Sequence, residues 1–448
     1  MTAAGACLLL LVSTTVAAAQ PTALSPDEPT AADVATAPRP GEESGRVDAE
    51  PGDSTARLVA RGGLFLPRMA FAALLKPVEG VVWVEERYQI RARAQRLFWN
   101  AAGTAGLMPT VHLESGFGLN AGARFVHRDV LGAGEQVTLD ASTGGRFREL
   151  ARVRFRSGER MPGVELALDA RYERRPKDAF YGIGNADAAV DARYRDRVMR
   201  ATTSADVQLG SAVHATFAGA LSDHEYSPST TGRPIGELYM TDALTGFDGT
   251  RAGYAEVELR WDTRGNASIW DVPSIVSTGS LLAAYAGRSV ALDAHPSYWR
   301  YGADIQRFVR LAAGPRVLAF RGHVDAVSGA VEEVPFTELP RLGGNKLLRG
   351  YPGDRFRDRI ALAAGIDYRW DLARNVSGTL FVDAGRVQRS IADIALDHVR
   401  IGYGVGLEVY GARSLIARVS AASSLDGGVF VDLALDPVFD LDRRVDRR

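Results

Sequence analysis

Apolar and polar side chains alternate with a period of two along most of the chain after about residue 106. Successive side chains of a β-strand point to opposite faces, so this pattern predicts strands with one apolar face and one polar face. The alternation is clear at residues 359–370, and it recurs around Ala255 and at residues 399–409 and 429–436. In the first of these stretches one face carries Ile360, Leu362, Ala364, Ile366, Tyr368 and Trp370, and the other carries Arg359, Ala361, Ala363, Gly365, Asp367 and Arg369.

These segments are longer than the strands of most soluble proteins. Soluble strands usually have about five or six residues, whereas a tilted strand needs about nine to eleven residues to cross a bilayer. The segments run to about ten residues or more, and their apolar faces often end in Tyr or Trp, as in the aromatic girdles of membrane barrels. The opposite faces carry Arg, Asp, Glu and Gly, which suit a water-filled interior. We therefore predict an all-β fold, a transmembrane antiparallel β-barrel of about 16 strands over residues 106–439.

The connections between the predicted strands differ in length. Long polar connections are expected near residues 176–196, 225–250, 264–277 and 327–358, whereas the turns at Gly145 and at Gly411-Ala412 are tight. Bacterial outer-membrane barrels have long loops on the outside and short turns on the periplasmic side. We therefore expect the long connections to share one side of the barrel.

Residues 61–105 follow a different pattern. Apolar residues such as Phe65, Leu74 and Val82 recur at roughly helical spacing, and Pro67 and Pro77 divide the segment. This predicts a short amphipathic helical segment before the barrel. Amphipathicity alone leaves two placements open: on the membrane-facing rim or in the lumen of the barrel, or packed against the following domain.

The chain ends have simpler patterns. An apolar run at residues 8–12 precedes three alanines at 17–19, which form a small-residue cleavage site, so residues 1–19 are predicted to be a secretory signal peptide. Residues 20–60 are rich in Pro, Ala, Asp and Glu, which predicts a disordered linker. Residues 440–448 form a charged tail. A signal peptide before a β-barrel predicts location in the outer membrane of a Gram-negative-type bacterium.

Composition restricts the function further. The formal net charge of −1 offers no bulk attraction to nucleic acid. Hydrophobic residues make up 46 % of the chain, but no apolar run is long enough for a helical membrane span. Cys7, in the predicted signal peptide, is the only cysteine, so we expect no disulfide and no cysteine-based metal site in the mature chain.

The sequence shows no motif for a metal, a cofactor or catalysis. The seven histidines lack the spacing of a metal-binding motif. The GYGVG stretch at residues 402–406 resembles a glycine-rich nucleotide loop, but it lies within an alternating strand and no helix follows it. No GxSxG element is present. We therefore expect no enzymatic activity and no cofactor, and the sequence identifies no small-molecule substrate.

One predicted connection is especially rich in glycine and arginine. It reads LGGNKLLRGYPGDRFRDR, residues 342–359, and its glycines would permit a tight backbone path. The next two predicted strands carry Asp367 and Asp383 on their polar faces. If the connection folds into the barrel, Arg349 could pair with both carboxylates through directional hydrogen bonds. On the residues alone, separately solvated charges are the commoner arrangement in a water-filled barrel.

This connection, followed by a strand and then by LFVDAGRV, resembles the barrel of the BamA/TamA outer-membrane assembly-factor superfamily, also called the bacterial surface antigen family. In that family the loop between the eleventh and twelfth strands carries an Arg-Gly-Phe/Tyr core that folds into the barrel, and its arginine pairs with acids on the following strands. Arg349, Gly350 and Tyr351 match that core, and Asp383 matches the acid of the F-x-D-x-G element. Asp367 stands where the family more often has Glu, which keeps the charge and shortens the side chain.

Two further stretches are similar to the same barrel: FYGIGN at residues 180–185 and LRWDTRGN at 259–266. The resemblance implies a role in inserting, assembling or translocating outer-membrane or secreted chains, with outer-membrane lipid as the other partner. Well-known members also carry periplasmic POTRA modules, for which residues 20–105 leave no room. This departure favours an alternative, a passive pore or structural surface barrel without assembly activity.

Overall fold

The computed structural model describes residues 97–114, 118–144, 148–185, 191–265, 276–311, 316–373, 376–393, 397–410 and 415–434. All of these ranges belong to the second of two compact units, Gln89–Arg448. The predicted signal peptide (1–19), the linker (20–60), most of the helical segment (61–105) and the charged tail (440–448) lie outside the described residues. No helix in the described ranges is long and apolar enough to cross a membrane.

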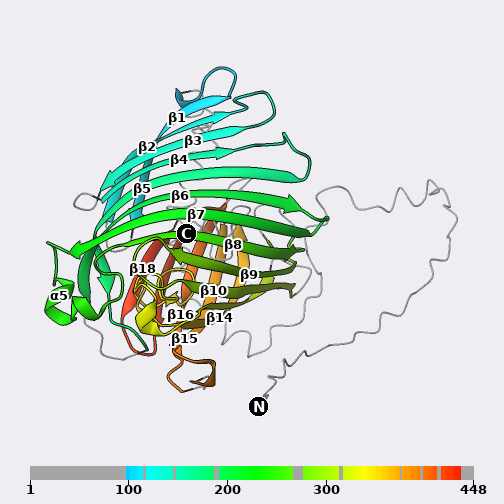
Figure 1. Ribbon diagram of the computed structural model, residues 1–448. Coiled ribbons are helices and arrows are strands. Elements are labelled where there is room, and N and C mark those ends of the chain that lie inside the picture. Colours follow the sequence, from blue (N-terminus) through cyan, green and yellow to red (C-terminus); the bar gives the residue numbers. More distant parts are fainter. Residues whose placement is uncertain are drawn as a thin grey trace, which may run out of the picture. The chain divides into compact units, whose positions relative to one another are not determined.

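In the described ranges, sixteen antiparallel strands form one continuous sheet, in which each strand pairs with the preceding and the following strand of that sheet (Figure 1). The predicted all-β barrel of about 16 strands is therefore confirmed. The strands of this sheet are β1 (Ala105–Glu114), β2 (Gly118–Arg128), β3 (Gln136–Gly144), β4 (Arg148–Arg156), β5 (Val164–Phe180), β6 (Ala192–Gln208), β7 (Val213–Pro228), β8 (Thr250–Asp262), β9 (Gly279–Ala291), β10 (Tyr298–Arg310), β11 (Arg316–Val327), β14 (Ile360–Ala373), β15 (Val376–Gln388), β16 (Arg400–Tyr410), β17 (Leu415–Ser424) and β18 (Val429–Ala434).

The sheet exposes its apolar face and covers its polar face. On β14, Ile366 is 47 % exposed and its neighbour Asp367 only 4 %. On β15, Leu380 is 46 % exposed and Asp383 is fully buried. This distribution is the reverse of a soluble sandwich, where the apolar face is the buried one. An exposed apolar face around a polar interior is the arrangement that a lipid bilayer stabilises.

Three long connections lie at one end of the strands, which we call the long-loop end. Because consecutive strands are antiparallel, the β5–β6, β7–β8 and β11–β14 connections (residues 181–191, 229–249 and 328–359) all lie at this end. The β8–β9 connection, residues 263–278, lies at the opposite end. Our expectation that all the long connections share one side is therefore wrong for this segment. The direction of the preceding strand decides at which end a connection lies, and the length of the connection does not.

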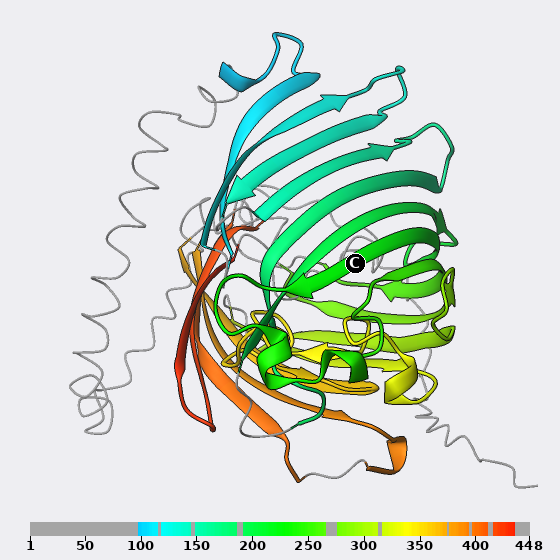
Figure 2. The same ribbon diagram turned by 60° about the vertical axis from the view of Figure 1, so that its left-hand side comes forward.

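Three of the connections contain short elements of their own. The β7–β8 connection contains α5 (Ile235–Leu238) and η1 (Thr241–Ala243), and the β15–β16 connection contains η3 (Ile391–Asp393). The β11–β14 connection contains η2 (Val331–Glu333) and the two-residue strands β12 (Arg341–Leu342) and β13 (Phe356–Arg357), which pair as a hairpin. Figure 2 shows the green β7–β8 connection beside the yellow β11–β14 connection, and a backbone hydrogen bond from Phe336 N–H to the Thr245 carbonyl (3.0 Å) joins them.

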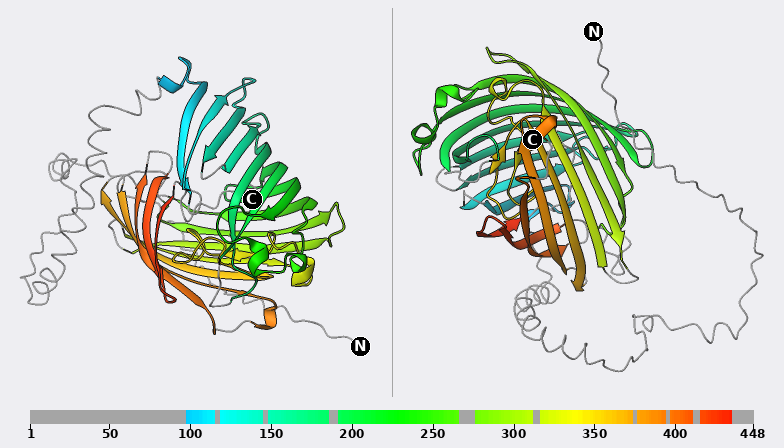
Figure 3. Two further views of the ribbon diagram at one scale, coloured as in Figure 1. Left: turned by 90° about the vertical axis from the view of Figure 1, so that its left-hand side faces the viewer. Right: turned by 90° about the horizontal axis from the view of Figure 1, so that it is seen from below.

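β1 and β18 are the two end strands of the sheet. Among the described residues no backbone pairing joins these two strands, although they approach each other at one place (Figure 3). Each therefore has one strand edge without a hydrogen-bonded neighbour in the described part of the chain. Unpaired strand edges can accept a further strand.

Candidate functional site

Arg349, on the β11–β14 connection, lies inside the barrel and is 3 % exposed. Its Nη1 and Nη2 donate to the two carboxylate oxygens of Asp367 at 2.9 and 2.6 Å. Its Nε and Nη2 donate to the two oxygens of Asp383 at 2.7 and 2.8 Å, and its backbone N–H donates to Asp383 Oδ2 at 2.9 Å. The planar guanidinium thus makes two forked contacts at once, which a lysine ammonium cannot reproduce.

The strand register explains why the two carboxylates meet at one point. Asp367 faces Phe381 across the β14–β15 pair, and Asp383 faces Gly365. The two acids therefore lie on the same inner face, two register positions apart on neighbouring strands. The structure brings Arg349, Asp367 and Asp383 together, which the sequence alone left open.

Two further side chains contact these three residues, and sequence reasoning missed both. Arg321 of β11 donates from Nη2 to Asp383 Oδ1 at 2.8 Å. The Phe381 ring lies beneath Arg349, with 3.6 Å between the guanidinium carbon and the ring centroid. The sequence could have identified Phe381, because residues two apart on a strand share a face and Phe381 therefore lies on the inner face with Asp383. Arg321 offered no such signal, since its contact depends on the β11–β14 register.

We call Arg349, Arg321, Asp367 and Asp383 the Arg349 cluster. Burial by itself would lower the pKa of the Arg349 guanidinium, but the nearby Asp367 and Asp383 carboxylates raise it above its ordinary value. The cluster pairs two guanidinium groups with two carboxylates, so its formal charge is balanced. Balanced, hydrogen-bonded charges are the form in which buried ions are tolerated.

Glycines give the loop backbone room to approach the wall. A Cβ added at Gly402 of β16 would overlap the carbonyl oxygen of Arg349, and one added at Gly350 would overlap the Ser423 carbonyl. Gly350 also has a φ of +95°, a conformation that L side chains rarely adopt. Gly402 of the GYGVG stretch therefore has a structural explanation: the wall carries no side chain at this position because the loop passes there.

Tyr351 extends the contact of the loop to the last strands. Its hydroxyl donates to Asp426 Oδ2 at 2.9 Å in the β17–β18 turn, and Arg400 of β16 donates to the same oxygen at 3.0 Å. Burial, together with the hydrogen bond to Asp426, raises the pKa of the Tyr351 phenol to about 12. Beneath it the loop packs on inner-face side chains in an apolar cluster made of Leu342, Leu348, Tyr351, Phe356, Ala361, Ala363 and Val387.

The two ends of the same loop are held at the opposite wall. The Phe336 ring contacts Phe180 of β5 and Tyr226 of β7 edge-on, with centroid distances of 5.5 and 5.2 Å. Arg357 is fully buried, donates to the Phe336 carbonyl at 3.1 Å and lies 5.0 Å from the Phe180 ring centroid. Its own carbonyl accepts a hydrogen bond from Gly184 N–H at 2.7 Å. The connection therefore crosses the barrel interior from β5–β7 to β14–β16.

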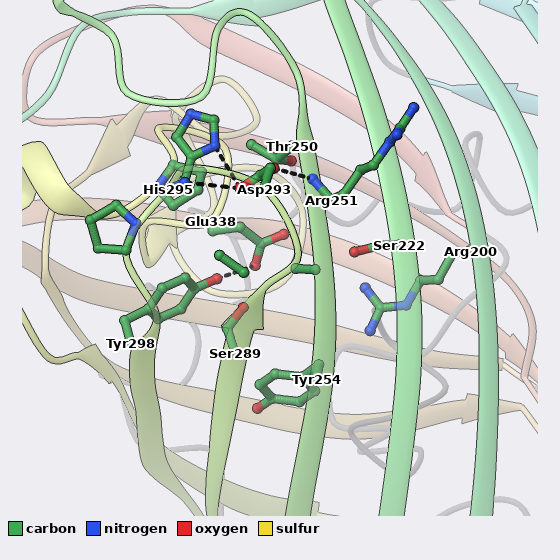
Figure 4. A pocket seen from close by; sticks show the side chains of 14 residues that line it. Arg200, Ser222, Thr250, Arg251, Tyr254, Ser289, Asp293, His295, Tyr298 and Glu338 are labelled. Carbon is green, nitrogen blue, oxygen red and sulfur yellow. Dashed lines mark hydrogen bonds and ion pairs between the residues drawn. The ribbon is translucent and has the colours of Figure 1, made fainter.

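A small polar pocket marks where this connection packs on the wall (Figure 4). Arg200, Tyr254 and Ser289 come from the strands, and Glu338 comes from the connection. Tyr298 donates its hydroxyl to Glu338 Oε2 at 3.3 Å. The cavity measures about 30 Å³, room for about two water molecules at about 10–15 Å³ each. A polypeptide segment could not pass through it.

Histidine and aspartate side chains of the described interior form pairs. Across the described ranges, no group of three or more His, Cys, Asp or Glu side chains could hold a metal ion. Several histidines instead contact a single aspartate, as His323 contacts Asp304 (2.6 Å) and His224 contacts Asp196 (3.2 Å). These pairs join neighbouring strands on the inner face.

Comparison with known proteins gives a family match and structural neighbours. The Omp85 superfamily domain matches residues 129–421. BamA from Haemophilus ducreyi lacking POTRA domains 1–3 superposes with a TM-score of 0.57 at 16 % identity, covering 74 % of this chain and 69 % of that one. CdiB from Acinetobacter baumannii (TM-score 0.45, 10 % identity, 74 % and 56 % covered) and CdiB from Escherichia coli (0.48, 12 %, 74 % and 60 %) are more distant. No curated protein matches the sequence.

Proposed function

The chain belongs to the Omp85 superfamily, and from this premise we propose that it is an outer-membrane barrel that inserts, assembles or translocates other chains. The observation that carries the proposal is the loop fixed across the interior by the Arg349 cluster, beside a sheet whose end strands are unpaired among the described residues. The relevant partners are unfolded outer-membrane or secreted chains and the surrounding lipid. We propose no enzymatic step and no cofactor.

The exposed face supports an outer-membrane location. Apolar side chains such as Leu282, Ile305 and Val382 are about half exposed to the outside of the sheet, whereas charged side chains line the inside. Water would disfavour such a surface, and lipid would favour it. The signal peptide proposed at residues 1–19 would direct export, the 20–60 linker and 61–105 segment would precede the barrel, and 440–448 would follow it.

The proposed mechanism uses the edges of β1 and β18. A strand edge without a neighbour offers N–H and C=O groups that an incoming extended chain can pair with, as in β-strand addition. The pairing would satisfy the backbone of the client strand, which lipid cannot do. A client would thus enter the bilayer with its hydrogen bonds already formed.

The Arg349 cluster would keep the wall formed by β11, β14 and β15 rigid during this exchange. It joins the loop to β11, β14 and β15, and Tyr351 joins the loop to the β17–β18 turn. The wall leading to β18 is thereby held from inside, while the edges of β1 and β18 remain able to separate. We propose this as the function of Arg349, Gly350, Tyr351, Asp367 and Asp383.

Reconstitution into liposomes tests the proposal. Unfolded client barrel is added to liposomes that contain the full chain, and folding is followed by its heat-modifiable gel mobility. We expect folding to be faster than in empty liposomes and than in liposomes holding an unrelated barrel. Dye efflux without faster folding would instead support the passive pore, and neither effect would support a structural surface barrel.

A further inference from the structure

The outward face of the sheet has a groove where β6, β7 and β8 present small side chains. Thr203 of β6 faces Gly219 of β7, and Gly219 faces Ala255 of β8. Around these residues lie two adjoining depressions of about 610 and 550 Å³, within the roughly 300–1,000 Å³ range of small-ligand sites. Larger side chains form the edges of this groove, which we call the lipid-side groove: Leu166, Leu168, Phe217, Leu221, Val257 and Val290.

A cation borders the lipid-side groove. Arg288 of β9 is exposed on the same outward face as Leu282 and Val290 and contributes to both depressions. Its guanidinium carbon lies 5.3 Å from the centroid of the Trp299 ring on β10. In the described ranges no acidic side chain forms an ion pair with it. A lipid-facing arginine is unfavourable unless it reaches an interface or an anion.

The position of Arg288 along its strand indicates which interface it meets. β9 ends at Ala291, so Arg288 lies near the long-loop end. Trp299, the second residue of β10, lies at the same level, and tryptophan is enriched where lipid meets water. Arg307, another outward arginine on β10, lies near the other end of that strand and donates to Ser280 Oγ at 2.8 Å.

We propose that the lipid-side groove binds an acyl chain of a phosphorylated lipid of the outer leaflet, with its phosphate paired to Arg288. This assignment rests on the proposed outer-membrane placement with the long loops outside. The apolar, small-residue floor accommodates the chain, and the guanidinium supplies forked donors for a phosphate. The fitting class is a lipid A-type phosphoglycolipid, because it carries phosphates at the outward surface.

Native mass spectrometry of the full, delipidated chain with added lipid A tests this proposal. We expect lipid A to remain bound to the wild type, and a dephosphorylated lipid A to bind less. Arg288→Gln should weaken retention roughly fivefold, as expected for one cation near a charged headgroup. Gly219→Leu should also weaken it by filling the groove, since a Cβ there meets nothing closer than 3.8 Å. Arg307→Gln is the matched control and should retain lipid A.

Several results would overturn the assignment. These are equal lipid A retention by the wild type and Arg288→Gln, no retention at all, and preferential retention of phosphatidylglycerol. A lipid-free dimer that Gly219→Leu abolishes would mean that a second copy occupies the groove instead. The assay does not depend on client folding, so a chain that retains lipid A without accelerating folding would refute only the assembly function.

Discussion

The backbone carbonyl of Arg349 passes directly over Gly402, leaving no space for a side chain at that position of β16. The absence of a side chain at Gly402 lets the loop backbone come this close to the wall. The loop places the Arg349 guanidinium at hydrogen-bond distance from carboxylates on two strands. Gly402, whose GYGVG stretch resembles a nucleotide-binding loop in sequence, is therefore part of the surface on which the β11–β14 connection docks.

Gly402→Ala should displace the loop. The added methyl group would overlap the Arg349 carbonyl, and overpacking of this kind costs about 1–3 kcal/mol. We expect faster proteolysis within residues 343–355 of the folded barrel, measured in detergent by mass mapping of the fragments. Gly322→Ala on β11 is the control, because a Cβ there meets nothing within 4 Å. Equal cleavage of the two variants would contradict the docking role of Gly402.

Arg349→Ala should lower the yield of folded barrel or loosen the loop. Removing one partner of a buried ion pair leaves Asp367 and Asp383 without that cation and costs about 3–5 kcal/mol. Heat-modifiable mobility and the protease resistance of the loop report the two effects. Arg341→Ala is a matched control, since its pair with Asp354 is exposed and should contribute about 0–1 kcal/mol. Unchanged mobility and protease resistance in Arg349→Ala would rule out the proposed role.

Alkaline pH should weaken loop docking through Tyr351. The ordinary phenol pKa is about 10, and in the folded chain burial and Asp426 raise the pKa of Tyr351 to about 12. Because the folded-state pKa is the higher one, this contribution to stability is complete below about pH 10 and is lost as pH rises through about 12. The thermal midpoint of the wild type should therefore fall more than that of Tyr351→Phe between pH 9 and 12. Tyr403→Phe, at an exposed outward position, should behave like the wild type; identical curves for all three chains would exclude Tyr351.

Leu380→Arg should destabilise the barrel in lipid. Leu380 lies near the middle of β15 and is 46 % exposed on the outward face. An arginine at the bilayer midplane costs about 2–4 kcal/mol, so the denaturant midpoint for unfolding in liposomes should fall. Leu292→Arg, in the β9–β10 connection, is the control and should have little effect. A similar midpoint for both variants would mean that this face of β15 does not contact lipid.

The sequence by itself determined the fold class, the face of each strand and the acids available to Arg349. These properties are local, because period-two alternation assigns every side chain of a strand to one of two faces. Tertiary structure decided what depends on contacts between distant residues. Arg321 reaches Asp383 only through the β11–β14–β15 register, and Phe336 meets Phe180 only because the loop crosses the interior. No periodic pattern encodes such contacts, since they arise from the register of several strands and the path of one long loop.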